Sequence, residues 1–559
     1  MTGLWYFISL GIVLVLMSLV IVNDRSKHDR LILIICLSTS FYSILSVLGP
    51  EGLGLLFKSN PNDGFTFGNS SFAAMYLFAT FMLSVYFVAK EKVKKWWLYL
   101  LPVSLLVNPY IISSKIWRGD FSDGIIGEAR ATTYVVILSL VSLIFVWLLA
   151  KIKDHKLRSI LSYTLAGGVF IGIVFLIFSL LSSGGLVRNF YLSQSSAARP
   201  LVWSVSEQAI SQRPYLGFGQ DNFERVFEVN YDNRLLQNEY GGEAWFDRAH
   251  NIFIDQLVDN GLVGLSLYLL VYIVSLLSLI YVALNASEQE DKLLAVILAV
   301  YFPLHLLELQ TAFDTSISYP ILGFMFVSAA VLFHRNWSYQ NKEIQFGLVG
   351  QYLSAGVVTI LTIFSLIYGL YPFLNSQVAN GQLRMVGDTD KRIPLYPALF
   401  GSKIDKQAIL WRTMTDFQRG VAENPKVLEN PKKVESIRQE LLIIKDEYRE
   451  YLKNNPDNFR AHLGLADVLI YSMLFGDNNL VEAQQVLDKA IELVPQSPQP
   501  YWMKAVAYVY MRKFDLAREF SSRGLALNPK IKQSQEVVAY VEKSIKTFPD
   551  LDLFFFRQI

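Results

Sequence analysis

One short stretch of the chain combines the side chains that proton transfer and anion binding require. It reads Arg248-Ala249-His250-Asn251. A histidine with a pKa near neutrality can take a proton from a hydroxyl as that hydroxyl attacks, and a guanidinium can hold the charge that develops on a leaving group. A lone histidine at a membrane boundary is more often a polar anchor, so its surroundings have to decide between the two interpretations.

The segment before this stretch carries arginine as its only kind of cation. Its basic side chains are Arg188, Arg199, Arg213, Arg225, Arg234 and Arg248. The planar guanidinium grips phosphate oxygens with two parallel hydrogen bonds and keeps its charge at every physiological pH. The alternative is that these arginines pair with the many carboxylates of the same segment. Two cations beside His250 would also lower its pKa and keep it a base.

Helices and a turn are expected to position these groups. Pro200–Gln212 is predicted to be a helix that the chain enters through a proline in the first turn. Gly217-Phe218-Gly219 follows, and because no strand precedes it, this spacing indicates a tight turn and not a phosphate loop. Asn222–Tyr240 is predicted to be helical again.

The residues after the histidine have two possible roles each. Asn251 could orient the histidine or an acceptor, or it could cap the helix that follows. Gly261 and Gly264 lie on that helix, where small residues allow helices to pack closely.

The composition indicates a membrane protein. The chain has 559 residues, of which 52% are hydrophobic and 18% charged, and its mean hydropathy is +0.33. A net charge of +2 gives no reason to expect a nucleic acid partner. The single cysteine, Cys36, lies in an apolar run, so neither a disulfide framework nor a cysteine metal site is expected. Met1–Tyr6 has no lysine or arginine, which predicts a retained first helix and no cleaved signal.

Roughly ten apolar runs are long enough to cross a bilayer. They are Leu4–Val22, Leu31–Gly49, Ser70–Ala89, Trp96–Ser113, Thr132–Ala150, Ile160–Leu181, Ile252–Leu284, Leu293–Leu309, Ile317–Phe333 and Leu348–Leu374. The seventh is longer than a bilayer needs, so it is expected to begin outside the hydrocarbon.

Basic loops predict the orientation. Arg25–Arg30, Lys90–Lys95 and Lys151–Arg158 follow the first, third and fifth runs, and the positive-inside rule places all three in the cytoplasm. The N-terminus, the arginine-bearing loop and everything after Leu374 are then outside. The connection Asn285–Lys292 is acidic and does not contribute to this assignment.

The chain is therefore predicted to be all-α, with a polytopic membrane bundle and a soluble helical domain on its outer side. The expected parts are 1–181 (N-terminal transmembrane bundle), 182–250 (large outer loop), 251–375 (C-terminal transmembrane helices), 376–433 (linker) and 434–559 (repeat domain). In the last part Ala483, Ala490 and Pro495 recur as Ala517, Gly524 and Pro529, at the roughly 34-residue period of tetratricopeptide repeats. Such repeats usually bind a protein in their groove, although this domain could instead only stiffen or shield the rest.

Two strings in the outer loop resemble a known family. Arg248-Ala249-His250-Asn251 with Gly261 and Gly264 resembles the end of the large periplasmic loop of O-antigen ligases, O-antigen polymerases and related protein O-oligosaccharyltransferases. Arg199-Pro200-Leu201-Val202-Trp203, then Pro214, Gly217 and Gly219, resembles the start of that region, and Gly68-Asn69-Ser70 resembles a further feature at an outer helix end. The Ser-Arg-Gly string of many members is absent, and Arg118 and Arg130 lie in its place.

The resemblance implies a GT-C-like membrane glycosyltransferase of the bacterial inner membrane that takes its glycan from a polyprenyl-pyrophosphate donor. By the same resemblance His250 is the general base, and Arg199 and Arg248 bind the pyrophosphate. Asn251, Arg118 and Arg130 are further candidates for binding donor or glycan. No cofactor and no metal ion are expected.

Several alternatives stay open on the sequence alone. A ligase, a polymerase and a protein O-oligosaccharyltransferase share this donor chemistry and differ in their acceptor: a lipid or other anchor, a lipid-linked glycan, or a protein hydroxyl. A transporter would explain His305, Glu308 and Asp314 near the eighth run, although no repeat of broken helices is evident. A scaffold would explain the repeat domain but not the many membrane spans.

Overall fold

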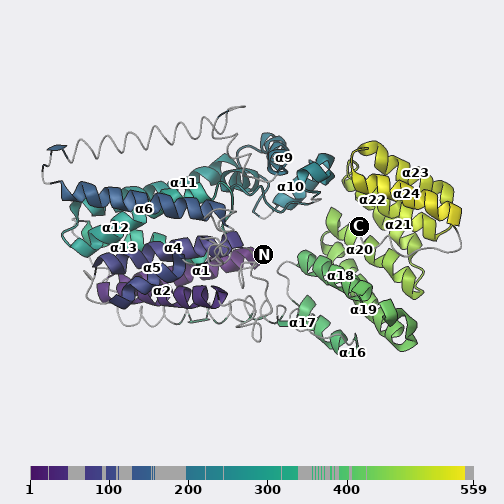
Figure 1. The fold of residues 1–559 in the computed structure, drawn as a ribbon, viewed down its shortest axis with the longest axis horizontal. Coiled ribbons are helices and arrows are strands. Elements are labelled where there is room, and N and C mark those ends of the chain that lie inside the picture. Colours follow the sequence, from purple (N-terminus) through teal and green to yellow (C-terminus); the bar gives the residue numbers. More distant parts are fainter. Residues whose placement is uncertain are drawn as a thin grey trace, which may run out of the picture.

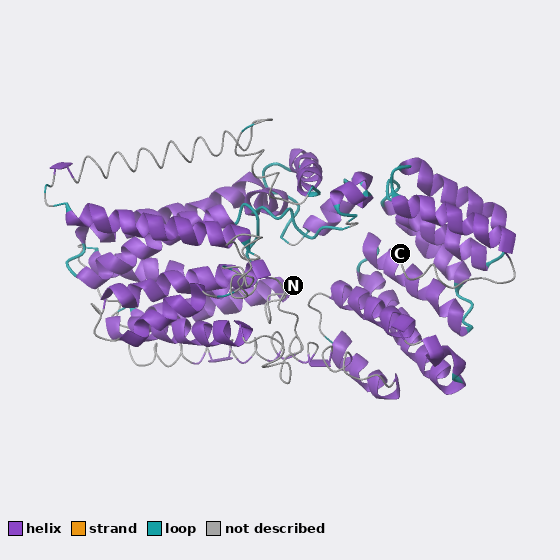
Figure 2. Ribbon diagram, in the orientation of Figure 1, coloured by secondary structure: helices purple, strands orange, loops and turns teal. Residues whose placement is uncertain are grey.

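The computed structural model describes most of the predicted elements. It describes residues 2–22, 24–47, 70–90, 96–106, 129–152, 197–220, 222–242, 245–315, 318–337, 389–401, 406–423 and 425–547, with single positions between some of these ranges. Helices joined by loops make up these residues, and no strand occurs in them, as Figure 2 shows. The all-α prediction is therefore confirmed.

The membrane half is a bundle of apolar helices (Figure 1). Its elements are α1 (Thr2–Ile21), α2 (Arg25–Val47), α4 (Ser70–Lys90), η3 (Trp96–Tyr99), α5 (Leu100–Leu106), α6 (Arg130–Lys151), α11 (Ile252–Asn285), α12 (Gln289–Glu308) and α13 (Ser318–Asn336). Among the described helices, four are long and apolar enough to cross a membrane: α4, α6, α11 and α13. The protein is thus a membrane protein with helical spans.

One predicted span is shorter than expected. Trp96–Ser113 becomes η3 and the seven-residue α5 within the described residues. Pro102 lies in the first turn of α5, the only part of a helix where a proline costs no hydrogen bond, so the helix cannot extend far before it. The predicted spans Ile160–Leu181 and, apart from single positions, Leu348–Leu374 lie outside the described residues.

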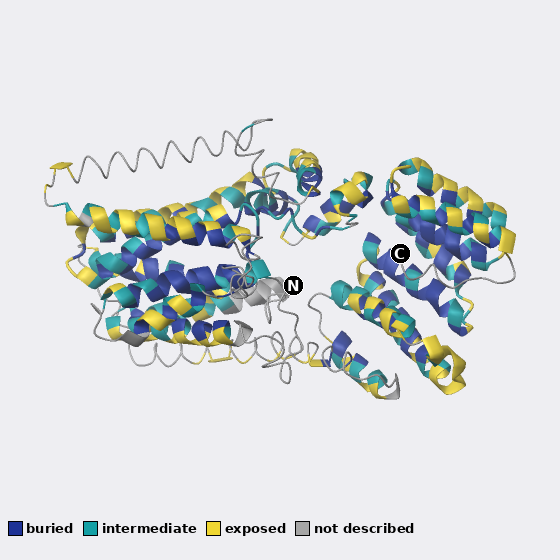
Figure 3. Ribbon diagram, in the orientation of Figure 1, coloured by how far each residue is buried: buried dark blue, intermediate teal, exposed yellow. Residues whose placement is uncertain are grey.

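Burial separates the inner helix from the lipid-facing ones (Figure 3). Most of α4 is buried, including Phe78, Phe81 and Met82. By contrast, α6 and α11 expose rows of large apolar side chains, among them Ile137, Val141, Ile144, Leu267, Val271 and Val274. An apolar surface of this extent is unfavourable in water and expected against lipid.

Ion pairs gather at one end of the bundle. Arg25 at the start of α2 donates two hydrogen bonds to Asp291, of 3.1 and 2.9 Å. Lys90 at the end of α4 contacts Asp29 and lies 3.0 Å from Glu290. Two of the predicted basic loops and the acidic connection between α11 and α12 therefore meet at this basic end. The acidic composition of that connection has a structural reason, because it neutralises the neighbouring cations.

The helices of the loop and of the C-terminal part form a second group. They are α9 (Arg199–Gln212), α10 (Phe223–Val229), η5 (Asn233–Leu236) and η6 (Asn238–Tyr240) from the loop, and then α16 (Thr389–Arg392), η8 (Ile393–Leu395), α17 (Tyr396–Phe400), α18 (Lys406–Glu423), η9 (Pro425–Glu429), α19 (Pro431–Asn454), α20 (Phe459–Ser472), η10 (Met473–Phe475), α21 (Leu480–Leu493), α22 (Gln499–Tyr510), α23 (Phe514–Leu527) and α24 (Lys532–Thr547). From α19 to α24 each long helix packs against the next. In Figure 1 the loop helices lie between the bundle and this stack.

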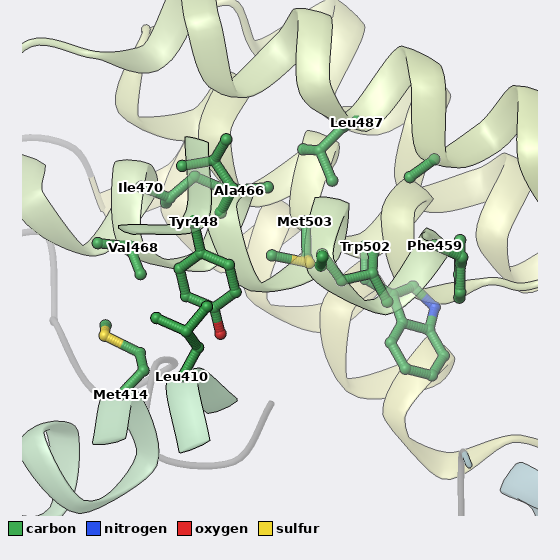
Figure 4. Close-up of a cluster of buried hydrophobic side chains, with 14 of the residues drawn as sticks. Leu410, Met414, Tyr448, Phe459, Ala466, Val468, Ile470, Leu487, Trp502 and Met503 are labelled. Atoms are coloured by element: carbon green, nitrogen blue, oxygen red, sulfur yellow. The ribbon is translucent and has the colours of Figure 1, made fainter. Parts of the chain in front are cut away.

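Two predictions about this part need correction. The predicted helix Asn222–Tyr240 breaks after α10, because Asn230 ends it and the side chain of Asp232 accepts a hydrogen bond from the backbone of Arg234. The predicted linker 376–433 contains α18, whose buried Leu410, Met414 and Phe417 repeat at helical spacing. Figure 4 shows Leu410 and Met414 beside Tyr448 of α19, so α18 belongs to the same hydrophobic core as the C-terminal helices that were predicted to be repeats.

Candidate active site

Helix α9 begins with Arg199 and lies near one end of the bundle. Pro200 occupies its first turn, as predicted, where the missing N–H has no helical partner to lose. The indole Nε1 of Trp203 donates a hydrogen bond to the carbonyl of Ala249, at 3.0 Å. Helix α9 is thus tied directly to the residue that precedes His250.

The two glycine-bearing strings of the family-like region hold each other by exchanging backbone hydrogen bonds. In an unbroken α11 the N–H groups of Leu262 and Val263 would bond the carbonyls of Val258 and Asp259. Instead, four bonds join the loop to the helix: Phe218 N to Val258 O (2.9 Å), Gly219 N to Asp259 O (2.7 Å), Leu262 N to Pro214 O (2.8 Å) and Val263 N to Tyr215 O (3.1 Å). We call this set the backbone exchange.

Glycine is required where the two backbones touch. Gly217 and Gly261 have φ values of +64° and +63°, a region that other residues rarely occupy. A Cβ on Gly261 would lie 2.3 Å from the Tyr215 carbonyl, and one on Gly217 would lie 2.5 Å from that of Asp259. Gly261 therefore packs against the loop and kinks α11, which differs from the predicted role in contacts between helices.

The remaining motif glycines also have local roles. Gly219 has φ +98°, and a Cβ there would lie 2.9 Å from the Nδ2 of Asn222. A Cβ on Gly264 would lie 2.1 Å from that of Asn260, because the kink brings these two positions together. The prediction of a tight turn at Gly217-Phe218-Gly219 is confirmed by the positive φ values of both glycines.

The backbone of His250 is fixed on both sides. Its φ is +54°, an unfavourable value for a residue with a Cβ. Before it, the N–H of Ala249 donates to Asp255 Oδ1 at 2.7 Å. After it, Asn251 caps α11 by accepting hydrogen bonds from the N–H groups of Phe253 and Ile254, at 3.0 and 3.4 Å. The capping role considered for Asn251 is therefore confirmed, and the flanking bonds hold His250 in its strained conformation.

The imidazole of His250 is half-buried between two aromatic rings. Its ring centre lies 6.3 Å from that of Phe246, edge to face, and 5.3 Å from that of Phe313. Burial lowers its pKa below the ordinary value, the positive charge of Arg199 lowers this pKa further, and Asp247 opposes both. A neutral imidazole near pH 7 is the form that can accept a proton.

The two candidate arginines differ in their surroundings. The positive charge of Arg199 lowers the pKa of His250. Arg248 donates to the buried Asp259 at 3.2 Å, and its guanidinium lies 5.8 Å from the ring centre of Phe313. Since Asp259 also takes part in the backbone exchange, the glycine strings fix the position of Arg248 through this carboxylate.

The connection between α12 and α13 forms the floor of this region. The N–H of Ile252 donates to Leu309 O at 2.9 Å, and Asn251 Nδ2 donates to Gln310 Oε1 at 3.2 Å. Phe313 contacts His250 and also packs edge to face on Phe72 at the start of α4, at 5.2 Å. Sequence reasoning missed Gln310 and Phe313, because neither residue type carries a signal without its spatial neighbours.

A buried polar cluster lies under that floor. His305 Nε2 is 3.4 Å from Asp314 Oδ1 and its Nδ1 is 3.9 Å from Glu308 Oε2. Glu308 also accepts a hydrogen bond from Thr132 of α6, and Asp314 accepts one from Ser318 at 2.9 Å. The cluster joins α6, α12 and α13 at the same end of the bundle as His250, which we call the site end.

The other predicted site residues are placed less closely. Arg130 begins α6 with an exposed side chain, two residues before Thr132, so it lies at the site end. Arg118 lies outside the described residues. Among the described residues, no group of three histidine, cysteine, aspartate or glutamate side chains could hold a metal ion.

Comparison with known families matches the part of the chain that contains this site. A family model described as O-antigen ligase matches residues 124–269, a range that includes Arg199, Arg248, His250 and both glycine strings. No curated protein matches the chain. The family takes a glycan from a lipid-linked donor and passes it to a glycan acceptor. The resemblance inferred from the motifs is thus confirmed: residues 124–269 of this membrane protein are similar to the O-antigen ligase family.

Proposed function

We propose that this protein is a glycosyltransferase that moves a glycan from a polyprenyl-pyrophosphate donor to an acceptor hydroxyl at the outer face of the bacterial inner membrane. The observation that carries the proposal is the placement of His250, half-buried, under the influence of Arg199 and beside Arg248, within the family-matched segment. A base next to two cations is the arrangement that transfer from a pyrophosphate requires.

The chemistry assigns one task to each group. The acceptor oxygen attacks the anomeric carbon of the donor sugar, and His250 Nδ1 or Nε2 takes the hydroxyl proton. The bond from that carbon to the pyrophosphate oxygen breaks, and the electron pair leaves with the polyprenyl pyrophosphate. Arg199 and Arg248 hold the negative charge on this leaving group, while Asn251 and the more distant Arg130 and Arg118 are candidates to hold donor or glycan. No metal ion takes part in this scheme.

The distribution of charge supports an outward-facing site. The ion pairs of Arg25 and Lys90 mark one end of the bundle, and the positive-inside rule assigns that end to the cytoplasm. The site end is the opposite end of α12, since this helix begins near Asp291 and finishes at Glu308. Polyprenyl-linked glycans would therefore meet His250 on the outer side.

The acceptor divides the proposal into three variants. An O-antigen ligase passes the glycan to a lipid or another anchor, and a polymerase passes it to a second lipid-linked glycan. A protein O-oligosaccharyltransferase passes it to a serine or threonine. The repeat domain on the same side favours a protein as acceptor or partner, because helical repeats commonly bind polypeptides.

The test is glycan transfer in membranes that contain a polyprenyl-linked donor. Replacing His250 by alanine removes the base, so the turnover should fall by about 10²- to 10⁴-fold. His334→Ala is the matched control, because His334 is exposed at the basic end, and it should transfer like the wild type. Transfer should continue in the presence of EDTA.

The three possible results of the transfer assay lead to different conclusions. Loss of transfer in His250→Ala at normal expression supports the base assignment, and the product size then separates ligase from polymerase. Normal transfer by His250→Ala would remove the base assignment. A wild type without any transfer would return a transporter or a scaffold to consideration.

A further inference from the structure

The outer loop and the repeat domain share one hydrophobic core. Phe223, Phe227 and Leu235 of the loop belong to the same buried cluster as Leu441 and Leu463 of the repeat helices. Residues more than 200 positions apart in the chain are thus packed together. The repeat domain is not a separate module on a tether, so it can influence the loop that carries His250.

Side-chain amides seal the edge of this core. Asn233 Nδ2 donates to Leu527 O at 3.2 Å, and Asn528 Nδ2 donates back to Asn233 Oδ1 at 3.1 Å. Gln237 Nε2 donates to Asn528 Oδ1 at 3.1 Å in a buried position. These reciprocal bonds fix η5 and η6 against the end of α23.

The loop also brings a carboxylate to the N-terminus of α20. The first four N–H groups of this helix, from Asn458 to Ala461, have no helical partners. That of Asn458 donates to Asn455 O at 3.1 Å, and that of Ala461 donates to Asn458 Oδ1 at 2.8 Å. The other two, from Phe459 and Arg460, face the buried carboxylate of Glu228 on α10 and lower its pKa. Docking of the loop thus places a polar group beside the two N–H groups that Asn458 leaves without a partner.

Arg460 connects this end of α20 to two tryptophans. Its guanidinium carbon lies 3.8 Å from the ring centre of Trp245 in the loop and 4.9 Å from that of Trp411 on α18. Glu224 accepts hydrogen bonds from Trp245 Nε1 and from Gln407 Nε2, both at 2.7 Å. A planar cation between two indole faces is favourable and directional, so Arg460 restrains the orientation of Trp245.

Trp245 is the first of the five residues that directly precede His250 in the chain. The next residue, Phe246, is buried and packs on Phe227 at 5.6 Å between ring centres. The other side of Phe246 meets the imidazole of His250. A displacement of Trp245 would therefore move the aromatic wall against which the imidazole rests.

We propose that Arg460 of the repeat domain is a positioning residue for His250, acting through Trp245 and Phe246. The inference rests on the proposed function for the role of His250 in transfer, but the contact path stands on its own. The repeat domain is then part of the catalytic unit, in addition to any partner it binds.

The experiment compares Arg460→Ala with Arg460→Lys and Arg518→Ala. Arg518 is the matched control, because it pairs with Glu542 on the exposed surface of α23 and α24, at 2.6 and 3.0 Å. Misplacing a reacting group by about 1 Å can cost 10²-fold in rate, so Arg460→Ala should lower kcat by about 10- to 100-fold. The KM for donor should stay near the wild-type value, because Arg199 and Arg248 remain. Lysine keeps the charge and loses the planar faces, so it should rescue only in part.

A second readout does not depend on transfer. The rate at which diethyl pyrocarbonate modifies His250 is measured by mass spectrometry in the full-length protein, with the exposed His334 as internal reference. We expect Arg460→Ala to raise the modification of His250 severalfold and to leave that of His334 unchanged.

The outcomes separate the two proposals. Unchanged modification of His250 in Arg460→Ala, relative to Arg518→Ala, would overturn the positioning role whatever the effect on kcat. Increased modification together with a lowered kcat would establish it. If the wild type transfers no glycan, the proposed function fails, while the modification rates still decide whether Arg460 positions His250.

Discussion

His250 combines a strained backbone with a neutralised side chain. A positive φ at a residue with a Cβ costs on the order of 1–3 kcal/mol, and the hydrogen bonds at Ala249 and Asn251 offset this cost. In this conformation the imidazole lies against the rings of Phe246 and Phe313. The side chain is thus placed before any substrate arrives.

The proposed role of His250 predicts how transfer depends on pH. As the proposed base, His250 must be neutral, and its pKa is lowered from 6.5 by burial and by Arg199. Transfer should therefore fall only when the pH drops through this lowered pKa, which lies below 6.5. Arg199→Gln removes a cation, raises the pKa of His250 and should move the acidic limb of the kcat profile to higher pH.

A variant at Asp247 should shift the acidic limb of the kcat profile in the opposite direction. Asp247 raises the pKa of His250, so Asp247→Asn should move the same limb to lower pH. The charged groups that act on the imidazole are Arg199 on α9 and Asp247 three residues before it, so these two variants test both signs. If the acidic limbs of the kcat profiles of Arg199→Gln and Asp247→Asn lie at the same pH, His250 is not the titrating base.

At the scale of elements, the kink of α11 provides a stability prediction. Gly261→Ala would place a methyl group 2.3 Å from the Tyr215 backbone at a φ of +63°. We expect a loss of about 2–4 kcal/mol in the free energy of unfolding and a large loss of transfer, since Asp259 and Arg248 would shift. Thermal unfolding in detergent checks this.

The control for that measurement is a glycine without close neighbours. A Cβ on Gly11 of α1 would meet nothing within 4 Å, so Gly11→Ala should be neutral or slightly stabilising. Equal melting temperatures for the two alanine variants would argue against the backbone exchange as a stabilising contact.

Most helices could be predicted from the sequence, but the contacts between distant segments could not. Long apolar runs such as Ser70–Ala89 and Thr132–Ala150 predict helices because a bilayer leaves the backbone no other partner. The proline before Leu201 and the cap at Asn251 also act locally, so the sequence indicates both. The backbone exchange joins residues 40 to 48 positions apart, and no local rule relates Gly217 to Gly261.

At the scale of the whole molecule, docking of the repeat domain should depend on pH. Burial, and secondarily the charge of Glu224, raises the pKa of Glu228 to about 8. The folded state therefore binds this proton more tightly than the unfolded state. The stabilisation is fully present below about pH 4.5 and is lost as the pH rises toward 8, by about 1.4 kcal/mol per pKa unit.

Glu228→Gln tests this dependence. The amide oxygen can still accept from the N–H groups of Phe459 and Arg460, and it does not ionise. The variant should melt higher than the wild type at pH 8 to 9 and show little difference at pH 5. Glu492→Gln, an exposed position on α21, should follow the wild type at every pH. A constant difference between the Glu228 variant and the wild type would rule out ionisation as the cause.

The site shows where prediction from sequence stops. The arginines, the histidine and the asparagine were recognisable because their types and order match a family string. The contacts of Gln310 and Phe313 with the site were not recognisable from the sequence. The stacking of Arg460 on two tryptophans was not recognisable either, since an arginine on a surface helix usually faces solvent. Only the folded chain shows that Arg460 lies between Trp245 and Trp411.

The backbone exchange also sets the smallest unit of this protein that could be replaced by the matching part of a relative. Pro214–Gly219 and Val258–Val263 each complete the hydrogen bonding of the other, so neither segment is self-sufficient. In a chimera that receives only the loop from a relative, the foreign loop would have to hydrogen-bond an α11 whose kink matches the original loop. A graft intended to change the acceptor should therefore transfer both segments together. It should also include the C-terminal helices, because they pack against the loop residues that lie between the two segments.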